Sequence, residues 1–220
     1  MKTFAAPVSL RHFAMSLSAR RLSLAGLAVC SWWLTLAPVI RAEPDISEIK
    51  LFGKWTNTTN PGQYVGHRVA LSDKWALVGS YAASVPGANF QGAVQVFNAA
   101  TGAWVRKLAP PAPALTNTSF GVSMAVVGDL GLIGAYGVHG YQGVVYVYNL
   151  ASGALRLTLS ASDGVSGDYF GFALAAKGTR VLVGANGRAS SKGAAYLFDL
   201  ATGLQLNRFD LDVSGVAGDN

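Results

Sequence analysis

A segment of about fifty residues occurs three times along this 220-residue chain. The copies run from Tyr64 to Leu108, from Phe120 to Leu159 and from Phe170 to Phe209. Four glycine positions keep their spacing in all three copies: Gly66, Gly121 and Gly171; Gly79, Gly134 and Gly184; Gly92, Gly143 and Gly193; Gly102, Gly153 and Gly203. A period of this length is typical of solenoids and propellers, in which each repeat covers the apolar surface of the next.

Each copy contains four short apolar runs that we predict to be strands. In the second copy they span 122–127, 130–134, 144–148 and 155–159. They are rich in Val, Leu and Tyr and are separated by Gly, Asp and Asn, which is typical of strands joined by hairpin turns. No sustained helical period occurs after residue 42. The sequence therefore predicts an all-β fold, a partial β-propeller of three four-stranded antiparallel blades.

Phe-Gly pairs begin two of the copies. Phe120-Gly121 and Phe170-Gly171 are followed by Ile133-Gly134-Ala135 and Val183-Gly184-Ala185, and Tyr/Phe-rich third strands complete the pattern. This pattern resembles the FG-GAP repeats of integrin-alpha-type β-propellers, in the form found in bacterial secreted proteins. Tyr64-Val65-Gly66 in the first copy is a looser match. The resemblance covers 64–209 and specifies the fold better than the function. We expect Gly121 and Gly171 to lie on innermost strands, where a missing side chain relieves crowding near the central axis.

The three copies are too few for a complete ring of the kind that the resemblance implies, which has about seven blades. Residues 49–52 are similar in spacing to an outermost strand, and 211–220 align with 160–169, so that the chain stops where another Phe-Gly pair is due. We interpret the chain as a truncated gene product or a fragment. The alternative is self-association, because the end blades would expose apolar faces and open strand edges.

The first 42 residues are predicted to direct export. They hold five basic and no acidic residues, an apolar run at 22–40, and Ala42 before a candidate cleavage point. These features are typical of a signal peptide, with an uncleaved membrane anchor through 22–40 as the alternative. We therefore expect a secreted, periplasmic or cell-surface protein with a lead-in segment at 43–63 and the blades within 64–220.

Charge and cysteine content exclude several classes of function. Beyond residue 42 the chain has 12 basic and 11 acidic residues, which gives no basic surface for nucleic acid. The single cysteine, Cys30, excludes an internal disulfide framework and a cysteine-cluster zinc site. We predict no nucleic-acid partner, and contact with a membrane only through 22–40.

Two segments of the chain can be compared with the metal and cofactor sites of known propellers. Integrin-type repeats bind calcium in an Asp-rich loop between their first two strands, whereas here that connection is a tight turn with one acid, Asp73 or Asp129. The segment 98–104 is similar to the Thr-Gly-Trp motif of quinoprotein propellers, but Trp104 follows Gly102 too closely. The sequence therefore predicts no metal, no cofactor and no catalytic residue.

Two sets of residues remain as candidates for binding. The loops before each third strand differ most between copies, and they carry Tyr81, Phe90, Tyr136, His139 and Tyr141. Loops on a rigid scaffold are where recognition residues concentrate, and aromatic residues often anchor a partner.

Asp163 and Asp168 form the second set, in the linker between the second and third copies. Paired carboxylates can serve acid–base chemistry or bind an ion, but they can equally shape the linker. We expect a non-catalytic module that binds a protein or a glycan. The alternatives are a fragment of a propeller enzyme, such as a carbohydrate-active hydrolase, and a remnant without activity of its own.

Overall fold

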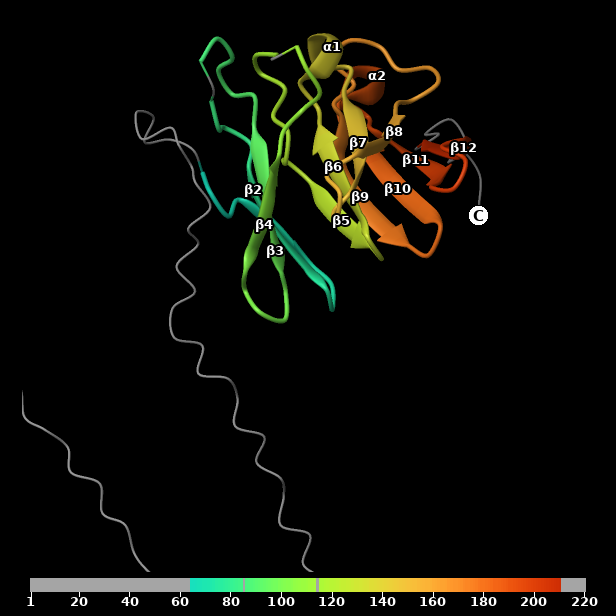
Figure 1. Ribbon diagram of the computed structural model, residues 1–220. Helices are drawn as coiled ribbons and strands as arrows, with labels where there is room; N and C mark the ends of the chain where they lie inside the picture. The colour runs from blue at the N-terminus through green and yellow to red at the C-terminus, as the bar shows by residue number, and fades with distance from the viewer. Residues whose placement is uncertain (1–63, 85, 114, 211–220) are drawn as a thin grey trace, which may run out of the picture. The chain divides into compact units, whose positions relative to one another are not determined.

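The computed structural model describes residues 64–84, 86–113 and 115–210 (Figure 1). All of these residues belong to one compact unit. The predicted leader at 1–42, the lead-in at 43–63 with its strand at 49–52, and the terminal segment 211–220 lie outside the described residues. Within the described part, no helix has both the length and the apolar character needed to cross a bilayer.

The described residues form three antiparallel sheets of four strands each. The first sheet contains β1 (Arg68–Leu71), β2 (Trp75–Ser80), β3 (Ala93–Asn98) and β4 (Trp104–Leu108). The second contains β5 (Met124–Val127), β6 (Leu130–Ala135), β7 (Val144–Asn149) and β8 (Leu155–Leu159). The third contains β9 (Phe170–Lys177), β10 (Arg180–Ala185), β11 (Ala194–Asp199) and β12 (Gln205–Asp210). The predicted number and antiparallel pairing of the strands are confirmed, whereas β5 is two residues shorter than the predicted run at 122–127 and β9 extends over eight residues.

Each sheet packs against its neighbours through alternate residues of the same strands. Successive side chains of a strand point to opposite faces. In β7, Val144 and Tyr146 belong to the apolar core shared with the first sheet, whereas Val145 and Val147 belong to the core shared with the third. The middle sheet is therefore covered on both faces, which explains its nearly continuous apolar runs.

Glycine allows neighbouring sheets to approach closely. A Cβ atom on Gly134 in β6 would lie 2.1 Å from the carbonyl oxygen of Gly171, and one on Gly79 would lie 2.8 Å from that of Gly121. The crowding at Gly121 and Gly171 is thus contact with the preceding sheet. Gly171 lies in β9, the first strand of its sheet, as expected, but the expectation that Gly121 lies on a strand is wrong, because β5 begins at Met124. Crowding near a central axis stays a prediction.

Successive hairpins divide the connections between two ends of the sheets. One end, here called the loop end, carries the β2–β3, β6–β7 and β10–β11 loops and the linkers 109–123 and 160–169. In Figure 1 it lies at the top, where two four-residue segments, α1 (Val138–Tyr141) and α2 (Arg188–Ser191), interrupt two of the loops. The inner residues of both segments have left-handed backbone angles, so neither is a regular helix. The opposite end, the turn end, carries the tight turns within each sheet.

Candidate functional site

All the predicted binding residues lie at the loop end. Tyr81 and Phe90 lie in the β2–β3 loop, and Asp163 and Asp168 lie in the linker between β8 and β9. Tyr136, His139 and Tyr141 lie in the β6–β7 loop. The structure separates these residues into aromatic and charged groups.

Four aromatic rings contributed by two sheets form one aromatic cluster: Tyr136, Tyr141, Tyr169 and Phe172. The centroid of the Tyr136 ring lies 6.3 Å from that of Tyr141, 5.6 Å from that of Tyr169 and 5.9 Å from that of Phe172. The rings of Tyr141 and Tyr169 are 5.6 Å apart. These separations lie in the range at which aromatic pairs attract each other. The cluster thus joins the β6–β7 loop to the start of the third sheet.

The aromatic cluster offers both apolar and polar surface to solvent. Tyr141 and Phe172 are 42% and 41% exposed, while Tyr136 and Tyr169 are half-buried. Among the described residues, none forms a hydrogen bond with the three tyrosine hydroxyl groups. A ligand could therefore contact the ring faces and also exchange hydrogen bonds with the hydroxyl groups, a combination that makes tyrosine frequent at binding surfaces.

Two residues of the aromatic cluster have left-handed backbone conformations. The φ angles of Tyr141 and Tyr169 are +68° and +55°, which bulky residues rarely adopt. The Tyr169 amide donates a hydrogen bond to the Tyr141 carbonyl oxygen at 2.8 Å, which ties the two segments together. Phe90 and Ser119 have φ angles of +52° and +53° at the equivalent repeat positions. Because the backbone requires this conformation whatever the side chain, glycine or asparagine would be less strained there. The aromatic side chains therefore need another explanation.

The other aromatic candidates lie outside the aromatic cluster. The ring of Tyr81 stacks on that of Tyr64 at 5.5 Å and meets His67 edge-on at 4.6 Å. Phe90 is 46% exposed. His139 is exposed and has a φ angle of +53°. Within the described residues, no ring contact connects Tyr81, Phe90 or His139 to the aromatic cluster.

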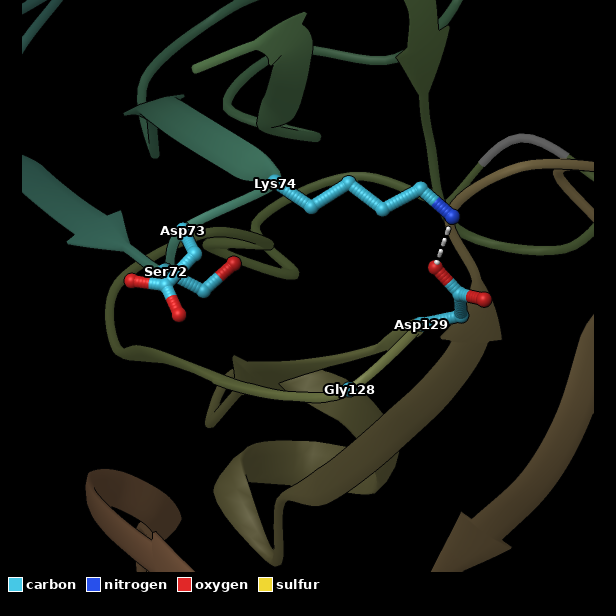
Figure 2. A pocket seen from close by; sticks show the side chains of 5 residues that line it. All are labelled: Ser72, Asp73, Lys74, Gly128 and Asp129. Carbon is cyan, nitrogen blue, oxygen red and sulfur yellow. Dashed lines mark hydrogen bonds and ion pairs between the residues drawn. The ribbon is translucent and has the colours of Figure 1, made fainter. Parts of the chain in front are cut away.

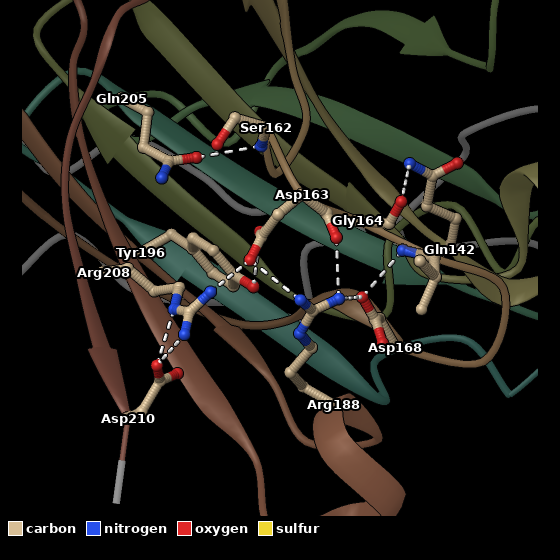
Figure 3. A network of polar contacts seen from close by, with 11 residues as sticks. Gln142, Ser162, Asp163, Gly164, Asp168, Arg188, Tyr196, Gln205, Arg208 and Asp210 are labelled. Atoms are coloured by element: carbon tan, nitrogen blue, oxygen red, sulfur yellow. Dashed lines mark hydrogen bonds and ion pairs between the residues drawn. The ribbon is translucent and has the colours of Figure 1, made fainter. Parts of the chain in front are cut away.

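The two acidic candidates belong to a charged network with two arginines (Figure 3). Arg188 donates to a carboxylate oxygen of Asp163 and to one of Asp168, both at 2.8 Å. Asp163 also accepts hydrogen bonds from Arg208 and from the Tyr196 hydroxyl group. Arg188 therefore holds both carboxylates together.

Asp168 is the most deeply buried member of this network. The residue is 2% exposed, and its carboxylate also accepts a hydrogen bond from the Val165 amide at 2.9 Å. Arg188 reaches the linker backbone as well, donating to the carbonyl oxygen of Asp163 at 2.7 Å. The network thus fixes the linker immediately before Tyr169, whose ring belongs to the aromatic cluster.

The pKa shifts agree with this structural role. Partial burial opposes ionisation of Asp163, but hydrogen bonds from Arg208 and Tyr196 outweigh it and lower the pKa of the carboxyl below 3.8. A hydrogen bond to Asp168 raises the pKa of Arg188. Burial, followed by the hydrogen bond to Asp163, raises the pKa of Tyr196 to about 12. Asp163 is therefore charged at neutral pH, whereas a general acid needs a pKa near the working pH.

A shallow pocket of about 370 Å³ lies at the turn end, between the β1–β2 and β5–β6 turns (Figure 2). Asp129 in this pocket accepts hydrogen bonds from the Lys74 ammonium group and the Trp75 indole, both at 2.8 Å. The hydrogen bond from Lys74, with that from Trp75, lowers the pKa of Asp129. These contacts connect the turns of two sheets. In the part of the chain that the structure describes, no three acidic, histidine or cysteine side chains are placed to hold a metal ion.

The comparison with known protein families matches residues 156–198 to the FG-GAP repeat. This segment is an FG-GAP repeat. It begins in β8 and ends in β11, so the matched segment takes its first strand from the second sheet and its other three strands from the third. Together with three sheets of the same topology, the match is consistent with the blades of a propeller. The comparison with curated proteins found no match.

Sequence reasoning missed two members of the aromatic cluster. Tyr169 and Phe172 flank the Phe170-Gly171 pair of the FG-GAP repeat, but Ser119 and Val122 occupy the equivalent positions in the second copy. The repeat alignment therefore gave no aromatic signal at these positions. These two residues could be found only by knowing that each Phe-Gly segment hydrogen-bonds to the loop of the preceding sheet, as Tyr169 does to Tyr141.

Proposed function

We propose that this chain is a non-catalytic binding module built from propeller blades, which recognises a protein or a glycan through the aromatic cluster at its loop end. The FG-GAP repeat and the three stacked sheets support the propeller. The aromatic cluster carries the proposal, since it combines exposed rings with hydroxyl groups that no described residue hydrogen-bonds, on a strained but well-anchored backbone.

The Asp163 and Asp168 contacts favour recognition over catalysis. In most glycoside hydrolases, one of two carboxyl groups must release or take up a proton near the scissile bond. Here Arg188 binds both carboxylates, and Asp168 is almost fully buried. These contacts supply a reason for both acidic residues that requires no substrate. We therefore assign them to positioning the linker that carries Tyr169.

The proposed location is outside the cytoplasm. The basic and apolar composition of residues 1–42 supports export, by cleavage of a signal peptide or through a retained anchor. The partner would then be an extracellular or periplasmic macromolecule.

A binding screen with matched variants tests the proposal. The purified protein is applied to a glycan array and to immobilised cell-surface proteins, and each hit is measured by surface plasmon resonance. Tyr141→Ala should weaken binding at least ~10-fold, as truncation of an aromatic anchor does at interfaces. Trp104→Ala is the control, because Trp104 is 48% exposed but lies at the turn end. A ligand that binds both variants equally well would refute the assigned surface, and a screen without any ligand would refute the function.

A further inference from the structure

The third sheet exposes a face that is buried in the other two. We call the face that a sheet turns to the following sheet its exit face. In the first two sheets four leucines of this face are between 0% and 4% exposed: Leu77, Leu108, Leu132 and Leu159. The equivalent positions in the third sheet hold Leu182 and Phe209, which are 39% and 48% exposed. Leu182 and Phe209 thus give the exit face of the third sheet an exposed apolar surface, and no sheet among the described residues covers it.

The first sheet exposes the complementary face. We call the face that a sheet turns to the preceding sheet its entry face. On this face of the first sheet, Val65, Val69 and Leu71 are 48%, 67% and 76% exposed. The equivalent residues of the other sheets pack in the cores between sheets: Phe120, Met124 and Val126 in the second, and Phe170, Leu174 and Ala176 in the third. The first sheet therefore keeps an apolar entry face.

Gly184 is an independent sign of a further sheet. It occupies the position of Gly134, where the backbone of the following sheet leaves no room for a Cβ atom. A Cβ atom added to Gly184 would have its nearest neighbour, the Cβ atom of Ala173 in the same sheet, at 3.3 Å. The φ angle of Gly184 is not positive, so the backbone conformation does not require glycine there. Glycine weakens a strand interior, and it commonly marks a place where another backbone approaches. Gly184 thus leaves the same space open on the exit face.

Backbone hydrogen-bonding groups match as well. Between sheets of this chain, the Phe120 amide donates to the Gln91 carbonyl oxygen at 3.1 Å, and the Phe170 amide donates to that of Gln142 at 3.0 Å. In the third sheet, Lys192 occupies the position of Gln91 and Gln142, and its carbonyl oxygen is the equivalent acceptor. In the first sheet, Val65 occupies the position of Phe120 and Phe170, and its amide is the equivalent donor. Neither group has a hydrogen bond to a described residue.

We infer that two copies of this chain associate head to tail, with the exit face of β9–β12 in one copy packed on the entry face of β1–β4 in the other. The contact repeats an interface that the chain already forms twice between its own sheets. The contact joins two different surfaces and is therefore heterologous. Heterologous contacts form a closed ring when the rotation that relates successive copies adds up to a full turn. The described residues of two copies supply six sheets, within the four to eight blades that propellers contain. A second copy therefore fits both exposed faces.

The association is measured by sedimentation velocity over a range of concentrations, with protein expressed from the full 220-residue sequence. Wild-type protein should associate reversibly. Leu182→Lys on the exit face and Val69→Asp on the entry face should each weaken the association at least ~10-fold, because each would bury an unpaired charge. Leu155→Lys is the control, since Leu155 is 41% exposed on β8 of the middle sheet. Near-ultraviolet circular dichroism confirms that each variant is folded.

A mixing experiment tests the head-to-tail arrangement itself. The Leu182→Lys protein keeps an intact entry face, and the Val69→Asp protein keeps an intact exit face. Their mixture should therefore associate under conditions in which each alone is monomeric. A monomeric wild type at high concentration would overturn the inference. So would association that Val69→Asp leaves unchanged, because this would indicate pairing of like faces.

Discussion

Removal of the Arg188 guanidinium group should destabilise the protein more than any change at the other arginine of the same network. Arg188 is the residue that binds both Asp163 and Asp168, and its side chain is 19% exposed. The Arg188→Met substitution keeps an apolar stem of similar length. Among the described residues, it leaves the buried Asp168 carboxylate with the Val165 amide as its remaining hydrogen-bond donor.

The size of the effect follows from the burial of the two partners. Breaking a buried ion pair costs about 3–5 kcal/mol, because it leaves a buried charge without its partner. The Asp163 side chain is 31% exposed, so water replaces part of what it loses. We expect a loss of about 2–4 kcal/mol, against a total stability of about 5–15 kcal/mol for a single domain. For a domain of this size, the melting temperature should fall by about 5–15 °C.

Thermal unfolding at pH 7, followed by calorimetry and near-ultraviolet circular dichroism, measures this loss. The near-ultraviolet signal should also change before unfolding, because the network fixes the linker before Tyr169. Arg208→Met is the matched control. The Arg208 side chain is 43% exposed, and exposed ion pairs contribute little to stability. The double variant Arg188→Met/Asp168→Asn should regain part of the loss, because it removes the buried charge.

Equal melting temperatures for the Arg188→Met and Arg208→Met variants would refute this reasoning. A double variant less stable than Arg188→Met would also refute it, since the unpaired Asp168 charge could not then be the cause.

Two further predictions concern pH. Folding lowers the pKa of the Asp163 carboxyl below 3.8. The ionised carboxylate should therefore stabilise the folded protein above about pH 4, and this stabilisation should be lost as the pH falls through the folded-state pKa. Acid titration followed by circular dichroism should show a smaller loss of stability in Asp163→Asn. Burial raises the pKa of Tyr148 from 10.0 to about 12, so stability should decrease between pH 10 and 12, where the unfolded chain loses protons first. In urea titrations Tyr148→Phe should show a smaller decrease over that interval, and at pH 7 it should lose about 0.5–1.5 kcal/mol through the missing hydrogen bond to the Ala109 carbonyl oxygen. An unchanged alkaline decrease in that variant would contradict the second prediction.

The sheets could be predicted from the sequence because the repeat and the strand period agree. Each run is short, ends at a turn and recurs at the same place in three copies, so errors in one copy are corrected by the others. The turn chemistry was also visible: Gly102 has a φ angle of +69°, and the Asn98 side chain accepts hydrogen bonds from the next amides along the turn.

The candidate site was only partly predictable because its contacts do not follow the repeat. Arg188 lies in a variable loop, 25 residues after Asp163, and no feature of the sequence indicates that one guanidinium group contacts both acids. Tyr136 and Tyr141 were identified from their loop, but their partner Tyr169 precedes a strand of the next sheet. Such contacts depend on how sheets stack, which spacing along the chain does not specify.

The stacking of the sheets through glycine is tested most directly by comparing Gly134→Ala with Gly184→Ala. Both glycines occupy the same position in the second strand of their sheets. A Cβ atom added to Gly134 would lie 2.1 Å from a carbonyl oxygen of the following sheet. A Cβ atom added to Gly184 would have its nearest neighbour, the Cβ atom of Ala173, at 3.3 Å. At protein concentrations too low for association, Gly134→Ala should lose about 3 kcal/mol or more in urea unfolding, because the two sheets must separate to admit the methyl group. Gly184→Ala should lose less than about 1 kcal/mol. Equal stabilities of the two variants would contradict the stacked arrangement.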